Sequence, residues 1–284
     1  EKSTRTHRMA AKKKSTPTLG QRVMEFCSSR MAAAIVVVAL IVYQINSPNA
    51  QTRLMRLASK SNFLGKDLQI NLSKPSGTLM GKLVTNFMLK VNTPSIQDLI
   101  ARLDLRPGDT AMELCFGPGS GLEELALYDG VSVLGVDISD AMHAKAAERV
   151  AEQIVEERIK LINASAHELP MVADGSVDKV VSMNCVYFWP SLPGTLAEIY
   201  RVMKPGGTLA TGGKFGVVQD FDPEIFRNRD QDVFLRALEE AGFVDVRAQE
   251  VRLSTGCPGK NGKGGCPINP NSHYTGVFAT KPMR

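Results

Sequence analysis

From Asp109 onward, the sequence alternates between short apolar segments of strand type and segments of helical type. The strand-type segments cover residues 110–115, 131–136 and 159–162, and the helical ones cover residues 123–127 and 141–155. This strand–helix–strand order favours a parallel sheet with right-handed crossovers, because each helix must return the chain to the starting end of the sheet. We therefore predict an α/β fold with a Rossmann-like, doubly wound sheet.

The turn after the first strand is rich in glycine and reads Glu113-Leu-Cys-Phe-Gly117-Pro-Gly119-Ser-Gly121. Glycine lets the backbone approach a ligand closely, and the N-terminus of the following helix offers unpaired N–H groups. A dinucleotide-binding G-x-G-x-x-G fingerprint would need its third glycine at position 122, which is Leu122. The turn therefore predicts a ligand-binding loop of another kind.

An acidic residue at the end of the first strand, followed by this loop, resembles motif I of class I S-adenosylmethionine-dependent methyltransferases. In that family the glycine turn packs against the amino-acid and ribose parts of the cofactor. The resemblance implies that S-adenosylmethionine is the cofactor and that Glu113, Gly117, Gly119 and Gly121 help to bind it. The chain departs from the family pattern at Cys115, which stands where the first glycine is usual.

The second strand ends in an acid, Asp137, 24 residues after Glu113. A carboxylate at the carboxyl end of a strand can accept hydrogen bonds from both hydroxyls of a ribose. In the resembled family the matching acid does this, and Ile138 would lie next to the adenine. The alternative from the residues alone is that Asp137 caps the helix that begins near Asp140.

Two further segments resemble the family. The stretch from Asn163 to Asp178 resembles its acidic-Ala-x-x-Leu-Pro segment, with Ser165 in place of the acid that contacts the adenine amino group. The resemblance then assigns Ser165, the backbone of Ala166, and Asn184 to the cofactor site, with weaker affinity as an expectation. The Lys-Pro-Gly-Gly turn at residues 204–207 resembles the turn before the fifth strand, and its role is architectural because Pro205 stops the helix.

The last third reads as a helix over residues 232–241 and strands over 244–253 and 274–280. This resembles the terminal hairpin of the family and implies a seven-stranded sheet whose last strand is antiparallel. The connection between the two strands is rich in glycine and contains Cys257 and Cys266. Two thiols nine residues apart and one histidine make an incomplete zinc set, so no metal is expected; a disulfide or a flexible rim remain alternatives.

Candidate substrate contacts come from the ends of strands. Tyr187 and Trp189 follow the fourth strand, at the sheet edge where ligands of such folds bind, and His273 precedes the last strand. Aromatic side chains there can flank a methyl acceptor, although packing beneath the next helix is the alternative. Methyl transfer needs proximity and alignment more than a fixed catalytic group, so no catalytic residue is assigned.

The charge is distributed unevenly along the chain. Residues 1–110 hold 17 basic and 6 acidic side chains, whereas residues 111–284 hold 17 basic and 23 acidic ones, so the net charges are +11 and −6. The second value makes nucleic acid an unlikely partner. We expect residues 1–30 to be a basic, mobile extension, a targeting sequence or a membrane-surface arm.

The apolar run within residues 31–46 is a candidate membrane anchor, although it is short for a spanning helix. A cleaved targeting signal and a buried helix are the alternatives. Residues 47–106 are expected to form a helical linker and lid, with an apolar stripe from Leu79 to Val91 over core or substrate and a second helix from Pro94 to Leu105. Residues 107–284 then form the methyltransferase domain.

These expectations combine into one function. The sequence predicts transfer of a methyl group from S-adenosylmethionine to a small, apolar or lipid-like acceptor near a membrane. A catalytically silent S-adenosylmethionine-binding module is the alternative, because Cys115 and Ser165 depart from the family pattern. Five cysteines without a tandem C-x-x-C favour a reducing compartment, and we expect a membrane-associated, cytosol-facing domain, or an organellar one if residues 1–30 are a targeting sequence.

Overall fold

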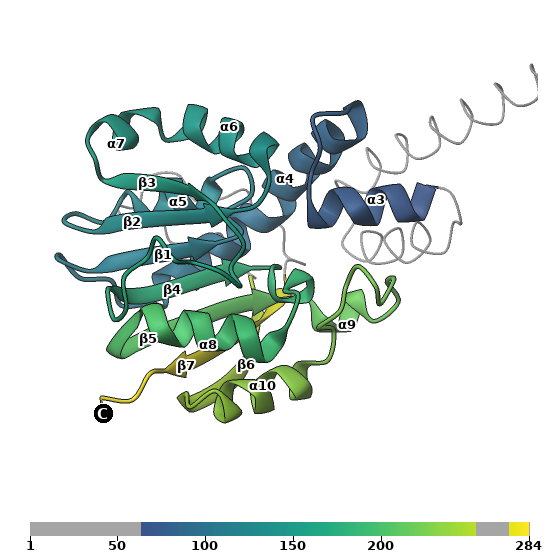
Figure 1. Cartoon of the computed structure of the whole chain (residues 1–284). Helices are drawn as coiled ribbons and strands as arrows, with labels where there is room; N and C mark the ends of the chain where they lie inside the picture. Colours follow the sequence, from purple (N-terminus) through teal and green to yellow (C-terminus); the bar gives the residue numbers. More distant parts are fainter. Residues whose placement is uncertain (1–63, 254–272, 284) are drawn as a thin grey trace, which may run out of the picture. The chain divides into compact units, whose positions relative to one another are not determined.

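A seven-stranded sheet forms the centre of the chain in the computed structural model, which describes residues 64–253 and 273–283 (Figure 1). The strands are β1 (Thr110–Leu114), β2 (Ser132–Asp137), β3 (Ile159–Asn163), β4 (Val177–Met183), β5 (Met203–Gly213), β6 (Val244–Arg252) and β7 (His273–Thr280). Their order is β3-β2-β1-β4-β5-β7-β6. Strands β1 to β5 pair in parallel, and β7 is antiparallel to both β5 and β6. The predicted Rossmann-like fold with an antiparallel last strand is confirmed.

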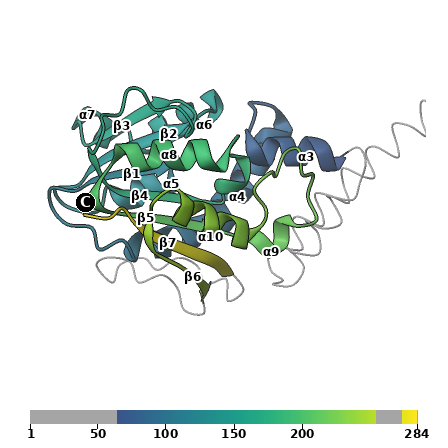
Figure 2. The same ribbon diagram turned by 60° about the horizontal axis from the view of Figure 1, so that its bottom comes forward.

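Helices cover both faces of this sheet (Figures 1 and 2). The helical elements are α3 (Leu64–Ser73), α4 (Leu79–Ala101), α5 (Ser120–Leu125), α6 (Asp140–Arg149), α7 (Ala151–Val155), the 3₁₀ turn η1 (Val186–Phe188), α8 (Leu192–Val202), α9 (Phe215–Val218) and α10 (Gln231–Glu240). Helices α8 and α10 lie on one face, and α4 and α5 lie on the other.

Two hydrophobic cores follow from the alternation of side chains along the strands. In β4, Val180 faces the core beneath α8 and α10, whereas its neighbour Val181 faces the core beneath α4 and α5. Leu209 and Ala210 of β5 divide between the two cores in the same way. Because both faces are covered, the central strands are mostly apolar, and they gave the clearest strand signal in the sequence.

Helix α4 differs from the expectation of two helices separated near Pro94. It runs unbroken from Leu79 to Ala101, with Pro94 inside it. A proline in a helix interior removes one backbone hydrogen bond. Beyond Pro94 the side chains of Ile96 and Leu99 are fully buried against the sheet, and this packing offsets the lost bond. The predicted start of a second helix at Pro94 is therefore wrong.

The apolar stripe on the first half of α4 is only partly buried. Val84 and Val91 are buried, but Leu79 and Leu83 are 75% and 40% exposed. The expectation that the whole stripe faces inward is therefore wrong at its N-terminal end. The helix predicted over residues 141–155 is also divided, because Val150 leaves the helical conformation between α6 and α7.

A disulfide joins Cys115, directly after β1, to Cys185, directly after β4. The low cysteine content predicts a reducing compartment, in which disulfides are rare, so this bond contradicts that prediction. The two strands are neighbours in the sheet, so their carboxyl ends bring together residues 70 positions apart in the sequence. The spacing of the cysteines along the sequence does not predict this contact.

The predictions for residues 1–30 and 31–46 and for the Cys257 and Cys266 loop fall outside the described residues. In the part of the chain that the structure describes, no helix combines the length and the apolar character needed to cross a bilayer.

Candidate active site

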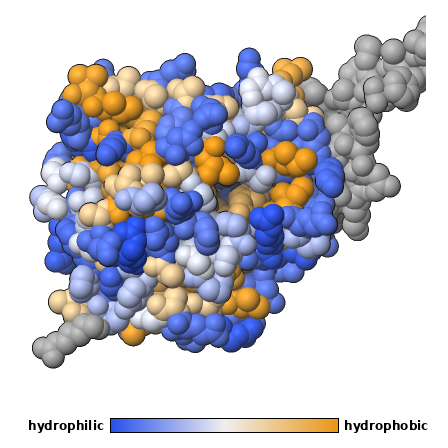
Figure 3. Space-filling view, viewed as in Figure 1, coloured by the Kyte–Doolittle hydropathy of each residue, from blue (hydrophilic) through white to orange (hydrophobic). Residues whose placement is uncertain are grey.

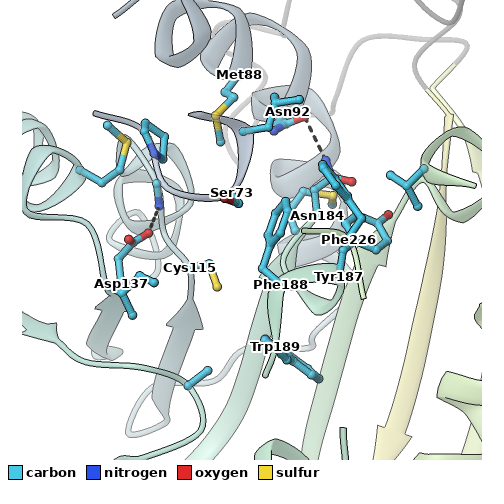
Figure 4. A pocket seen from close by; sticks show the side chains of 18 of the residues that line it. Ser73, Met88, Asn92, Cys115, Asp137, Asn184, Tyr187, Phe188, Trp189 and Phe226 are labelled. Atoms are coloured by element: carbon cyan, nitrogen blue, oxygen red, sulfur yellow. Dashed lines mark hydrogen bonds between the residues drawn. The ribbon is translucent and has the colours of Figure 1, made fainter. Parts of the chain in front are cut away.

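An open cavity lies at the carboxyl ends of β1, β2, β4 and β5, where ligands of open α/β sheets bind (Figure 4). Its volume is about 1150 Å³ including the mouth. Figure 4 shows Asp137 on one side and Tyr187, Phe188 and Phe226 on the opposite side, with Met88 and Asn92 of α4 above them. The cavity thus has a polar side near β2 and an aromatic side near β4, and α4 covers both.

Asp137 is held in place by two backbone groups. The N–H of Gly117 donates to Oδ2 at 2.9 Å, and the N–H of Ser139 donates to Oδ1 at 2.9 Å. Burial raises the pKa of the carboxyl, and the two hydrogen bonds oppose that rise. The cap of α6 is Ser139, whose side chain accepts from Met142, so the capping alternative for Asp137 is wrong. The carboxylate faces the cavity with lone pairs left for a ligand.

Only one of the three loop glycines contributes to the cavity wall. Gly117 lines the cavity at φ +54°, a left-handed conformation that favours glycine. Gly119 and Gly121 lie outside the lining, where they allow close packing: a Cβ would come within 3.0 Å of Ala146 at position 119 and within 2.2 Å of the Glu113 carboxylate at position 121. Cys115 keeps a glycine-like φ of +55° and lines the cavity.

Glu113 lies beneath the loop rather than in the main cavity. It lines a smaller adjoining pocket, together with Asn92 and Gly117, and it is 4% exposed. Its carboxyl group accepts from the backbone N–H of Leu122, at the start of α5. Burial, and then the nearby charge of Asp137, raise the pKa of this carboxyl well above its ordinary value. Its visible role is to hold the loop against α5.

We expect Glu113→Gln to stabilise the fold increasingly as the pH rises. A carboxyl whose pKa is raised in the folded state makes its full contribution to the free energy of unfolding below its unfolded pKa of about 4.3. That contribution is lost as the pH rises toward the folded pKa. Glutamine does not titrate. Urea unfolding from pH 4 to pH 8 should therefore show a difference in unfolding free energy between variant and wild type that widens as the pH rises. Glu152→Gln, on exposed α7, is the control. A difference for Glu113→Gln that stays constant with pH would contradict a raised pKa at Glu113.

Asn184 supplies an unpartnered polar atom beside the cavity. Its Nδ2 donates to Oδ1 of Asn92 at 3.0 Å, while its own Oδ1 is buried without a partner. An orphaned buried acceptor costs free energy unless a ligand donates to it. An ammonium group, such as the one on the amino-acid part of S-adenosylmethionine, satisfies this requirement, so the residues present fit that cofactor.

The other predicted cofactor contacts meet around the same cavity. Ile138, Ser165 and Ala166 all line it, on the side of Asp137. Ile138 is 45% exposed, so it lies at the mouth, whereas Ala166 is buried. The Ser165 hydroxyl accepts from the backbone N–H of His167 at 3.3 Å. The placement agrees with the sequence, and the individual contacts to the cofactor stay predictions.

The candidate substrate residues divide into two groups. Tyr187 and Trp189 line the cavity and are also buried, because Tyr187 packs on Phe215 and Trp189 packs on Phe234. They therefore both line the cavity and pack in the core beneath it, and their contact with a substrate stays a prediction. His273 is exposed at the start of β7 and lies outside the cavity lining, so its prediction as a substrate residue is not supported by its position.

Several lining residues were missed in the sequence. They are Leu72, Ser73 and Pro75 near α3, Asn92 on α4, Lys214 after β5, and Val217, Val218, Phe221 and Phe226 beyond it. Lys214 could have been found, since it follows a parallel strand at the ligand-binding edge. Asn92 lies on the polar side of a helix that was predicted, and the remaining residues come from segments without a periodic pattern. Within the described residues, no three His, Cys, Asp or Glu side chains are grouped to hold a metal ion.

Comparisons with known proteins identify the family. Residues 112–211 match the family described as a methyltransferase domain. An uncharacterized methyltransferase, YdaC of Bacillus subtilis, is 34% identical over 151 residues, which are 53% of this chain and 80% of that protein. A demethylmenaquinone methyltransferase of Symbiobacterium thermophilum is 35% identical over 39% of this chain and 45% of its own length. A sterol 24-C-methyltransferase of Pneumocystis carinii is 28% identical over 38% of this chain and 28% of its own.

The chain spans less than half the length of the last two relatives. Among solved structures, phosphoethanolamine N-methyltransferase 2 of Haemonchus contortus, in complex with S-adenosylhomocysteine, has the same fold. Its TM-score is 0.57 at 17% identity, over 76% of this chain and 60% of that one. The matched domain, the relative aligned over most of its length and the acid-and-glycine cavity agree, and the chain belongs to the class I S-adenosylmethionine-dependent methyltransferases.

Proposed function

We propose that this chain transfers a methyl group from S-adenosylmethionine to a small, apolar or lipid-like acceptor close to a membrane. The observation that carries the proposal is the aromatic side of the cavity. Tyr187, Phe188 and Phe226 form a cluster with ring centroids 4.8–6.0 Å apart, and Phe221 packs on Phe226 at 4.8 Å. A wall of this composition favours an apolar acceptor through burial of apolar surface.

The cofactor, when bound, supplies a methyl group already activated on a sulfonium. Asp137 would accept from its ribose hydroxyls, and Asn184 Oδ1 would accept from its ammonium group. The helix α4 excludes water from above, since Phe87, Met88 and Val91 line the cavity. These residues position two reactants and keep the site dry, which are the main contributions that methyl transfer requires of a protein.

The named relatives support an apolar acceptor, since one is a sterol methyltransferase and another is a demethylmenaquinone methyltransferase. Membrane proximity is supported by the surface around α3 and α4. Ile70, Leu79 and Leu83 expose apolar side chains on the helices that cover the cavity, and Figure 3 shows apolar surface over α3. The apolar run at 31–46 gives a further reason. We propose a membrane-associated domain that faces the cytosol, or an organellar one if residues 1–30 are a targeting sequence. The Cys115–Cys185 disulfide favours the second, because disulfides are rare in the cytosol.

The test is methyl transfer from labelled S-adenosylmethionine into a membrane lipid extract and, separately, into a water-soluble metabolite extract. We expect label in an organic-phase product and none in the aqueous one. Label only in the aqueous product would overturn the apolar acceptor. Binding of S-adenosylhomocysteine without transfer into either extract would favour the catalytically silent module instead.

A further inference from the structure

Lys214 lies on the side of the cavity away from Asp137. It follows the end of β5, whereas Asp137 ends β2, and the strand order between them is β2-β1-β4-β5. Three steps between neighbouring strands separate the two positions by roughly 14 Å. Of the predicted cofactor contacts, Asp137, Ile138, Ser165 and Ala166 lie on the β2 side, and Asn184, after β4, is the one nearest to β5, where its backbone N–H donates to the carbonyl of Gly212. Lys214 lies beyond Asn184 in the strand order, so we assign it to the acceptor side of the cavity.

The backbone of Lys214 is fixed by its neighbours. Its N–H donates to the hydroxyl of Tyr187, and its carbonyl accepts from the N–H of Val217 at 2.8 Å. Tyr187 is buried, and it packs on Phe215, the residue after Lys214. The backbone from which the Lys214 side chain extends is therefore held beside the aromatic side of the cavity.

The ammonium group of Lys214 has no hydrogen-bond or ion-pair partner in the described part of the chain. Three of the four other half-buried lysines have one: Lys179 donates to Thr208, Lys204 to Asp178, and Lys281 to two backbone carbonyls, whereas Lys145 on α6 has none either among the described residues. Lys214 differs from Lys145 in that it lines the cavity. Burial lowers the pKa of Lys214 to about 8, as expected for a partly buried charge without a compensating partner. Such a charge is costly unless a ligand brings the opposite one.

The surroundings of this ammonium group define the ligand that fits. Tyr187, Phe188, Val217 and Phe226 also line the cavity and offer apolar surface, and the Tyr187 hydroxyl is engaged by the Lys214 backbone. The remaining carboxylate in the lining, Asp137, is on the opposite side. A ligand that satisfies both features has an apolar body and an anionic group.

We propose that Lys214 is a specificity-determining residue that pairs with an anionic group, a carboxylate or a phosphate, of an otherwise apolar methyl acceptor. This inference rests on the proposed function and narrows its acceptor to an anionic amphiphile. A hydrogen-bonded ion pair in a site of low polarity is stronger than a neutral contact, so it discriminates against an uncharged analogue of the same length.

Matched ligands test the proposal. The full chain, saturated with S-adenosylhomocysteine, is titrated by calorimetry with dodecanoate, dodecyl phosphate and dodecanol below their aggregation limits. For the wild type we expect one or both anions to bind roughly tenfold to hundredfold more tightly than dodecanol. The stronger of the two anions identifies the head group.

Three variants separate the charge from the fold. Lys214→Met should remove the preference for the anion while dodecanol binding stays the same, and Lys214→Arg should restore much of it. Lys160→Met, an exposed lysine on β3, should behave as wild type. Unchanged affinity for S-adenosylhomocysteine in Lys214→Met shows that the cofactor side is intact.

Two results would overturn the proposal: equal affinity of the wild type for the anions and dodecanol, including no binding of any of them, or a preference that survives in Lys214→Met. Either result, obtained with S-adenosylhomocysteine bound, leaves the methyltransferase assignment in place. Failure to bind S-adenosylhomocysteine would count against the proposed function itself, so the two failures are distinguishable.

Discussion

Asp137→Asn should lower the affinity for S-adenosylhomocysteine by about a hundredfold or more. The carboxylate accepts from Gly117 and Ser139 and has lone pairs left for two ribose hydroxyls. An amide keeps one acceptor oxygen and places an NH₂ group where a second donor must approach. Losing one hydrogen bond to a charged group costs about 1.5–3 kcal/mol, and the bond that remains falls to the roughly 0.5–1.5 kcal/mol of a neutral one, so the total loss is about 3 kcal/mol, or roughly a hundredfold.

Calorimetric titration of the purified variant measures this effect. Asp140→Asn is a suitable control, because Asp140 lies three residues further on, is exposed, and accepts only from the Asn163 side chain among the described contacts. The urea midpoint of each variant shows whether the fold is retained. A loss of less than about threefold in Asp137→Asn, with the fold retained, would show that the ribose is held elsewhere.

Reduction of the Cys115–Cys185 disulfide should lower the free energy of unfolding by about 2–4 kcal/mol. The bond closes a loop of 70 residues, and a cross-link of this span removes much of the freedom of the unfolded chain. It joins the ends of two neighbouring central strands, so it restrains the glycine loop and the aromatic segment after β4 together.

Urea unfolding with and without dithiothreitol measures the difference. The double variant Cys115→Ser/Cys185→Ser should unfold at the lower concentration under both conditions and show no response to the reductant. A wild type that unfolds identically with and without reductant would contradict a stabilising bond. Alkylation of the unreduced protein followed by peptide mass spectrometry locates the bonded pair independently.

Much of the fold was predictable because its signals are local. The segments that became β1, β2 and β4 are short, apolar and bounded by turn residues, which is the pattern of strands buried on both faces. Asp137 could be assigned to the cavity because a parallel strand delivers its last residue to the ligand-binding edge. The same rule predicted Tyr187 at this edge, whereas the family resemblance assigned Ser165 and Asn184 to the site, and all three line the cavity.

The errors arise where tertiary contacts override local preferences. Pro94 looked like a helix start, yet the burial of Ile96 and Leu99 on the sheet keeps α4 continuous through it. His273 does begin a strand at the ligand-binding edge, because β7 runs antiparallel to β5 and its Thr275 pairs with Gly213 at the end of β5. It is nevertheless exposed and outside the cavity lining, so its contact with the substrate stays a prediction.

The aromatic side of the cavity could not be predicted from local sequence patterns either. Phe221 and Phe226 come from an irregular segment that is held by side-chain bonds to distant backbone. Asn228 donates to the carbonyls of Val186 and Trp189, and Arg229 donates to that of Phe221. Such contacts depend on where two loops meet in space, and no periodicity in the sequence indicates them. The Cys115–Cys185 pair is a contact of the same kind.

The position of β7 has a consequence for the order in which the sheet is assembled. Among the described strands, β6 pairs only with β7, and β7 fills the place between β6 and β5. Strands β1 to β5 can pair with one another before β6 and β7 are in place, whereas β6 has no partner among the described strands until β7 pairs with it. The sheet is therefore completed when residues 244–252 and 273–280 dock onto β5 as one antiparallel unit. Until then β5 is an unpaired edge strand, which is prone to association with other chains.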